Sequence, residues 1–143
     1  MNREILFKAK RLDNGEWIEG LLIYICLCSI NENEEIDEEY VLGIQRLNKS
    51  YQIDPTTLCQ FTGLTDKNGR RIFENDICST DIKRPYAYVV FRNGCFMYQL
   101  NDGEEKDYFD IMMPIEPLVN SDKYTEVIGN VFDNPELLDE RKL

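Results

Sequence analysis

Apolar and polar residues alternate over short segments along most of this chain, which is the pattern of half-buried β-strands. Asn-Gly pairs at 14–15, 68–69 and 93–94 interrupt the pattern, and this pair is the strongest short-range sign of a β-hairpin. The segments "ILFKAK" and "EWIEGLLIYICL" flank the first pair, so we expect an opening hairpin with a long second strand. The run "LLIYICLCSI" at 21–30 is too short to span a bilayer and no small-residue cleavage site follows it, so we interpret it as a buried strand.

Shorter strands follow, with a candidate boundary at Asp54-Pro55, because proline ends ladder pairing. From residue 57 onward the strands are short and closely spaced, as in a small barrel: "LCQFTGL", "RRIF", "DICSTD", "YAYVVF", "CFMYQL" and "EVIGNVF". Asn134 as N-cap and Pro135 at the first helical position predict a short C-terminal helix. The expected fold is mainly β: an N-terminal β-hairpin region (1–56), a small β-barrel (57–136) and a helical tail (137–143).

The hairpin around Asn93-Gly94 can be given a register. A two-residue type I′ turn there sets Phe91 opposite Phe96 and Val89 opposite Tyr98. One face is then wholly apolar and is expected to be a core face: Ala87, Val89, Phe91, Phe96, Tyr98 and Leu100. The other face is mixed and aromatic, with Tyr86, Tyr88, Val90 and Met97 as its main residues. This second face either packs against the N-terminal part or serves as an interaction surface, within one chain or between subunits.

The stretch "FTGLTDKNGRRIFENDI" at 61–77 is strongly specified locally. A two-residue turn at Asn68-Gly69 would set Leu64 against Phe73. A type I turn starting at Asp66, with Gly69 in the left-handed bulge position, would set Leu64 against Ile72. We favour the second register, because it uses each turn residue in its preferred place.

The segment "FENDI" that ends this stretch is expected to form a tight turn. Asn75 there tolerates positive φ, and Asp76 can accept hydrogen bonds from neighbouring backbone N–H groups.

Composition narrows the function classes. The chain has 143 residues, a net charge of −11 and no histidine, so the commonest acid/base catalyst and metal ligand is missing. This acidity disfavours sequence-independent binding to nucleic acid or anionic membrane. The five cysteines show no disulfide-like spacing, which favours a reducing cytoplasm.

Acidity is densest at 31–40, which holds six acids and no base. We interpret this segment as a solvated hairpin tip or irregular loop. The alternative is a docking surface for a basic partner, with Glu34, Glu35, Glu38 and Glu39 as candidate contacts.

Three small clusters deserve a chemical test. Cys26 and Cys28 would share one face of a strand, and we favour small buried apolar residues over a zinc site, since no second pair follows. Glu74 and Asp76 are two residues apart in a turn, where capping is commoner than paired-carboxylate catalysis. The basic residues Lys67, Arg70 and Arg71 are weak candidates for a phosphate contact in acidic surroundings, and we interpret them as a solvated hairpin tip.

"IDPTTLCQFTGLTDKNGRRIFENDI" resembles the central signature of the YopX family of phage and prophage proteins. The opening "REILFKA" with Trp17 and Gly20, and the closing "EVIGNVFDNPELL", are similar to the family's ends. Cys59 and Asn75 stand where the family usually has glycine, and the 31–40 segment falls where the family varies. The resemblance implies a β-rich fold whose C-terminal part is an SH3-like barrel. It implies no activity, and it makes Gly63, Asp66, Asn68, Gly69, Asn75 and Asp76 turn residues of the family motif.

We therefore expect a non-enzymatic phage or prophage accessory protein of the bacterial cytoplasm, without cofactor or metal, that acts through a protein partner or self-association. A nucleic-acid-associated regulator that uses the SH3-like barrel is one alternative, and an enzyme of unrecognised class is another.

Overall fold

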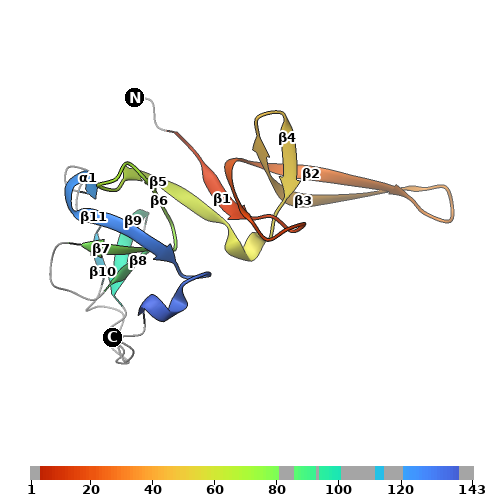
Figure 1. Ribbon diagram of the computed structural model, residues 1–143. Coiled ribbons are helices and arrows are strands. Elements are labelled where there is room, and N and C mark those ends of the chain that lie inside the picture. The colour runs from red at the N-terminus through yellow and green to blue at the C-terminus, as the bar shows by residue number, and fades with distance from the viewer. Residues whose placement is uncertain (1–3, 81–85, 93, 101–111, 115–120, 139–143) are drawn as a thin grey trace. The chain divides into compact units, whose positions relative to one another are not determined.

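The computed structural model describes residues 4–80, 86–92, 94–100, 112–114 and 121–138. Its fold is mainly β, with two antiparallel sheets (Figure 1). The chain divides into two compact units between Gln60 and Phe61, and each unit is described by itself below. The domain boundary expected at 56/57 stays a prediction.

The N-terminal unit is built from antiparallel strands. Hydrogen-bonded neighbours follow the order β4-β3-β2-β1-β5. The expected opening hairpin is confirmed, with Gly15 in the left-handed region at its turn (φ 72°). The elements are β1 (Phe7–Lys10), β2 (Trp17–Ile30), β3 (Ile36–Arg46), β4 (Lys49–Gln52), the 3-10 turn η1 (Pro55–Thr57) and β5 (Cys59–Thr65).

The core of this unit lies at the base of the β2–β3 hairpin. Its buried residues are Ala9, Ile18, Ile44 and Ile53, and Phe7, Leu22, Leu42, Tyr51 and Leu58 pack against them. Gly20 allows a close approach here, because a Cβ atom on it would overlap the backbone carbonyl oxygen of Gln45. Gly20 of the opening motif is therefore required for this close packing.

The β2–β3 hairpin extends well beyond this core. Ten residue pairs join the two strands, from Leu21–Gln45 to Ile30–Ile36. β1 pairs with β2 only up to Gly20, and β4 pairs with β3 only over 43–46. The far part of the hairpin is a two-stranded ribbon, visible in Figure 1 as a long pair of arrows closed by a loop. We call residues 24–41 the arm.

The arm corrects one sequence expectation. The run 21–30 is a strand, as predicted, but it is not buried: Tyr24 is 75% exposed and Ile30 is 74% exposed. Only β3 pairs with this part of β2 among the described residues, so no further strand of the sheet lies beside these side chains. Apolar composition alone could not reveal how many strands flank the run.

The C-terminal unit contains a five-stranded antiparallel sheet in the order β10-β9-β8-β7-β11, while β6 pairs with the second half of β5. Its elements are β6 (Arg71–Phe73), β7 (Asp76–Thr80), β8 (Ala87–Arg92), β9 (Cys95–Leu100), β10 (Met112–Pro114), the helical turn α1 (Ser121–Tyr124), β11 (Thr125–Asn130) and the 3-10 turn η2 (Pro135–Leu138).

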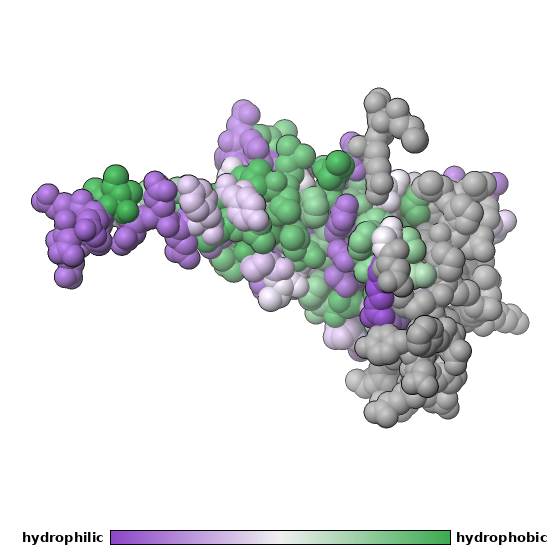
Figure 2. Space-filling view, turned by 180° about the vertical axis from the view of Figure 1, so that it is seen from behind, coloured by the Kyte–Doolittle hydropathy of each residue, from purple (hydrophilic) through white to green (hydrophobic). Residues whose placement is uncertain are grey.

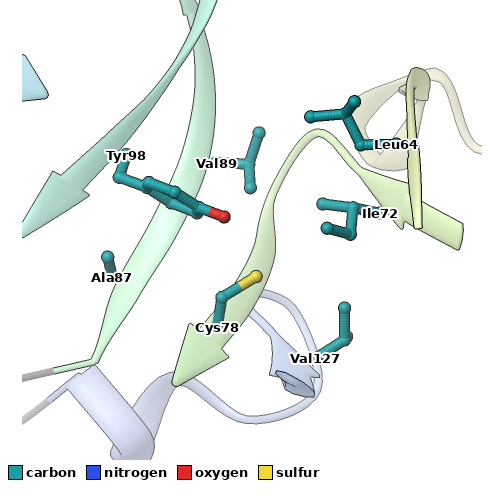
Figure 3. Packing of buried hydrophobic residues seen from close by; sticks show 7 residues of the cluster. All are labelled: Leu64, Ile72, Cys78, Ala87, Val89, Tyr98 and Val127. Atoms are coloured by element: carbon teal, nitrogen blue, oxygen red, sulfur yellow. The ribbon is translucent and has the colours of Figure 1, made fainter. Parts of the chain in front are cut away.

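Side chains from six strands form the core of this unit. Figure 3 shows them gathered in one cluster: Leu64, Ile72, Cys78, Ala87, Val89, Tyr98 and Val127. The register proposed for the β8–β9 hairpin is confirmed, with Val89 opposite Tyr98 and Phe91 opposite Phe96. Its apolar face is a core face at Ala87, Val89 and Tyr98, whereas Phe91 is exposed and packs edge-on against Phe96.

Two finer expectations are not met in the described part of the chain. Its strands do not close into a barrel. The C-terminal helix is reduced to the single 3-10 turn η2, and the expected tail beyond residue 138 lies outside the described residues. No helix found in the described residues is long and apolar enough to cross a membrane.

Candidate interaction surface

Asp66 closes the turn of the central motif and ties it to β11. Its Oδ1 accepts hydrogen bonds from the N–H groups of Asn68 (2.9 Å) and Arg70 (2.8 Å), and Oδ2 accepts one from Val127 N–H (3.0 Å). Burial of this carboxylate would raise its pKa, but the three backbone donors outweigh burial and the pKa of Asp66 lies below its ordinary value. The Asp66 carboxylate of the motif therefore stabilises the fold.

The register favoured for this hairpin is confirmed. Gly69 has φ 78° and its N–H donates to the Asp66 carbonyl, as a type I turn with a left-handed bulge requires. Thr65 pairs with Arg71, which is the register that places Leu64 opposite Ile72. Gly63, with φ 87°, lies where the β5–β6 pairing shifts.

The second motif turn is also built as expected. Asn75 has φ 68°, and its N–H donates to the Val89 carbonyl at 2.7 Å. Asp76 is buried, and its Oδ2 accepts the Phe73 N–H at 2.8 Å. The carboxylate of Asp76 therefore caps this turn, as the sequence indicates.

The closing motif forms a third local network. Asn130 Oδ1 accepts the N–H groups of Phe132 (3.0 Å) and Asp133 (2.9 Å). Asn134 Oδ1 accepts Asn130 N–H at 3.2 Å, so this side chain reaches back instead of capping η2. A Cβ atom on Gly129 would overlap the Asn134 side chain. The side chains of Asn130 and Asn134 therefore accept hydrogen bonds from backbone N–H groups and stabilise the local fold.

The cysteine pair forms no metal or catalytic site in the described residues. Cys26 and Cys28 do share a strand face, but both are exposed, so their interpretation as buried residues is wrong. Their Sγ atoms lie 3.2 Å apart, and the hydrogen bond between them, together with the charge of Glu38, raises the pKa of Cys26. No group of three histidine, cysteine, aspartate or glutamate side chains in the described residues could hold a metal ion.

The basic residues of the central hairpin are partly engaged within the C-terminal unit. Lys67 Nζ lies 3.3 Å from Glu126 Oε2 on β11, and Lys67 N–H donates to the Thr125 carbonyl. The Arg71 guanidinium lies over the Phe61 ring, 5.9 Å from its centroid. Together with Asp66, the Lys67 contacts hold this turn against β11.

The aromatic face proposed on the β8–β9 hairpin is only half-exposed. Val90 pairs with Met97, and Tyr88 precedes Val90 by two residues, so the three share a face. Tyr86 lies just before β8, and all four side chains are half-buried. Whether this face packs against the N-terminal part or binds a partner stays a prediction.

The acidic segment lies on the arm and is more ordered than an irregular loop. Asn31 Oδ1 accepts the N–H groups of Asn33 and Glu35, and Glu34 takes the left-handed position (φ 62°). Glu34 and Glu35 form the hairpin tip, whereas Glu38 and Glu39 belong to β3. All four are exposed, and hydrophilic residues gather at the far end of the hairpin in Figure 2.

The arm also carries a surface that the sequence interpretation missed. One of its faces is formed by residues at even positions, which we call the tyrosine face: Tyr24, Cys26, Cys28, Ile30, Ile36, Glu38 and Tyr40. Ile36 is 69% exposed and Tyr40 is 63% exposed. Residues 24–30 are almost continuously apolar, so their sequence gives no alternation that marks one face as exposed.

Comparisons with known proteins place the chain in a family. The crystal structure of protein EF1440 from Enterococcus faecalis is similar, with a TM-score of 0.51 and 22% sequence identity over 96% of this chain and 100% of that chain. At this identity the likeness shows the fold alone. No curated protein matches the chain. The family model described as YopX protein matches residues 6–139, so the resemblance seen in the motifs is confirmed and the chain belongs to the YopX family.

Proposed function

We propose that this YopX family protein is a non-enzymatic accessory protein of phage or prophage origin. It acts in the bacterial cytoplasm through contact with another protein. The observation that carries the proposal is the exposed apolar surface on the arm, where Tyr24, Ile30, Ile36 and Tyr40 are all more than half exposed. Exposed apolar side chains that gather on one face of a protein often mark an interaction site.

The family motif supports a role without catalysis. The carboxylates of Asp66 and Asp76 accept hydrogen bonds from backbone N–H groups of the same hairpin region. A catalytic carboxylate needs instead to reach a substrate within hydrogen-bond distance. The motif is therefore explained by folding, and it leaves the protein's surface to carry the function.

Affinity capture tests the proposal. Tagged full-length protein, expressed in the host with phage genes induced, is expected to retain a specific protein that mass spectrometry identifies. The matched bait carries charge reversals at Glu34, Glu35, Glu38 and Glu39, and it should retain less of that protein if the acids contribute. Capture of no specific protein under these conditions would contradict the proposal.

The proposal includes an SH3-like architecture for the C-terminal unit, which the five-stranded antiparallel order supports. Some folds of this kind bind nucleic acid, but the net charge of −11 opposes attraction to phosphates. A gel-shift series over salt concentration separates the two functions. A shift at low salt that fades as salt rises would favour nucleic acid over a protein partner.

A further inference from the structure

The tyrosine face continues the core of the N-terminal unit. Leu22, Leu42 and Ile44 lie on the same side of the β2–β3 hairpin and belong to the core cluster or pack against it. From Tyr24 outward the same side is exposed, and apart from Glu38 it remains apolar as far as Ile30 and Ile36. Within the N-terminal unit, therefore, one apolar face of the hairpin is part of the core at its base and is exposed along the arm.

The ribbon that carries this face is weak by itself. A two-stranded hairpin is marginally stable in water at best, and it gains stability when its apolar face is covered. The side-chain contacts on the tyrosine face include a long one from Tyr40 Oη to Glu38 Oε2 (3.4 Å) and the contact between the two cysteine sulfurs (3.2 Å), and both are exposed. A partner on this face would add the missing layer.

Charge indicates what kind of partner fits. No lysine or arginine occurs between Arg11 and Arg46, whereas the arm alone holds six acids. Glu38 lies on the tyrosine face, and the acids of the tip, Glu32, Glu34 and Glu35, lie between Ile30 and Ile36 in the sequence. Apolar side chains bordered by carboxylates are complementary to a segment that carries both apolar and basic residues.

We propose that the tyrosine face of the arm is the docking site for a basic, amphipathic segment of a partner protein. This inference rests on the proposed function and specifies its site and its partner chemistry. A second copy of the chain fits poorly, because two arms would bring their acids together. Nucleic acid and anionic membrane carry the same sign of charge as the arm.

The first experiment titrates the full-length protein with a fluorescein-labelled twelve-residue peptide in which lysine alternates with leucine. We expect saturable binding, followed by fluorescence anisotropy, that weakens as salt rises because the acids contribute. A peptide with glutamate in place of lysine should bind at least about tenfold more weakly. Equal binding of the two peptides, or no binding of the basic one, would overturn the proposal.

Variants locate the binding site. The double variant Tyr24→Ser with Tyr40→Ser removes two exposed rings and should weaken binding about tenfold or more. The matched control is Leu47→Ser, because Leu47 is 88% exposed but lies in the turn between β3 and β4, outside the arm. An unchanged dissociation constant for the double variant, or an equal loss in the control, would refute the site.

Thiol chemistry gives a readout that needs no variant. Cys26 and Cys28 lie on the tyrosine face, and Cys95 is an exposed cysteine of the C-terminal unit. Saturating basic peptide should slow alkylation of the first two by iodoacetamide at least about fivefold, as expected for burial of the face. Cys95 should react at its original rate. Unchanged rates at all three would contradict docking on this face.

Sedimentation separates self-association from docking. If the protein dimerises without peptide, and if Tyr40→Ser abolishes the dimer, the face belongs to a second copy and the proposal fails. Failure of the inference is also distinguishable from failure of the proposed function. A captured host or phage protein that the arm variants retain at wild-type levels would leave the function standing while removing the arm as its site.

Discussion

Replacement of Asp66 by alanine tests whether the family motif is a folding device. The change removes three hydrogen bonds to backbone N–H groups, and the one from Val127 is buried. An orphaned buried N–H costs about 1–3 kcal/mol, and the two half-buried donors of the turn should cost about 0.5–1 kcal/mol each because water can reach them. We expect the C-terminal unit to lose about 3 kcal/mol of unfolding free energy.

Amide hydrogen exchange measures the loss of unfolding free energy separately for each unit. This separation is needed because the chain divides into two compact units, which can unfold in separate steps. The matched control is Asn31→Ala. Asn31 caps the tip turn of the arm through two backbone N–H groups in the same way, but its third hydrogen bond, from Nδ2 to Glu35 Oε2, is exposed instead of buried. Because water reaches all of these groups, Asn31→Ala should cost about 1 kcal/mol or less, and only in the N-terminal unit. A loss below about 1 kcal/mol for Asp66→Ala would refute the reasoning.

Acid unfolding gives a second measure of the same carboxylate. Its pKa in the folded state is lowered, so its contribution is present above the unfolded value near pH ~4 and is lost as pH falls through the folded value. Asp66→Asn should therefore flatten the fall in stability of the C-terminal unit below about pH 4. An acid limb identical to that of the wild type would contradict the lowered pKa.

Three further changes have defined outcomes. Burial raises the pKa of Tyr98 to about 12, despite its hydrogen-bond contact with Thr125, so ultraviolet titration should show a late-titrating tyrosine that is lost in Tyr98→Phe. The stabilising effect of this raised pKa is full below about pH 10 and is lost as pH rises toward 12. Gly20→Ala should cost about 2 kcal/mol or more in urea unfolding followed by tryptophan fluorescence, since its Cβ would overlap the Gln45 carbonyl. Glu34→Gly should stabilise the arm by about 1 kcal/mol, seen as slower amide exchange in β2 and β3, because the left-handed backbone favours glycine. A high-pH tyrosine titration unchanged in Tyr98→Phe, a neutral Gly20→Ala or faster arm exchange in Glu34→Gly would contradict these arguments.

Sequence was most informative where local turn chemistry decides the structure. The β8–β9 register followed from Asn93-Gly94, and the bulge at Gly69 followed from the order of residues after Asp66. In both cases a few dihedral preferences leave only one or two registers open. The positive φ of Asn75 was predictable for the same reason.

Features that depend on distant neighbours were not predictable. The bond from Val127 to Asp66 joins positions 61 residues apart, and no local pattern encodes it. The exposure of Tyr24 and Ile30 depends on where β1 and β4 stop pairing, which a strand's own composition does not reveal. The tyrosine face was therefore hidden inside a run that had the composition of a buried strand.

The turns capped by Asp66 and by Asn31 share one hydrogen-bond pattern and differ at the left-handed position. Gly69 occupies it in the first turn and Glu34 in the second, at φ 78° and 62°. A non-glycine residue there costs about 1 kcal/mol, so local stability alone would favour glycine at the tip. A residue that breaks a local rule without a packing gain points to function. Glu34 adds a negative charge near the end of an arm that has six acids and no base, and a basic partner would be attracted by that charge.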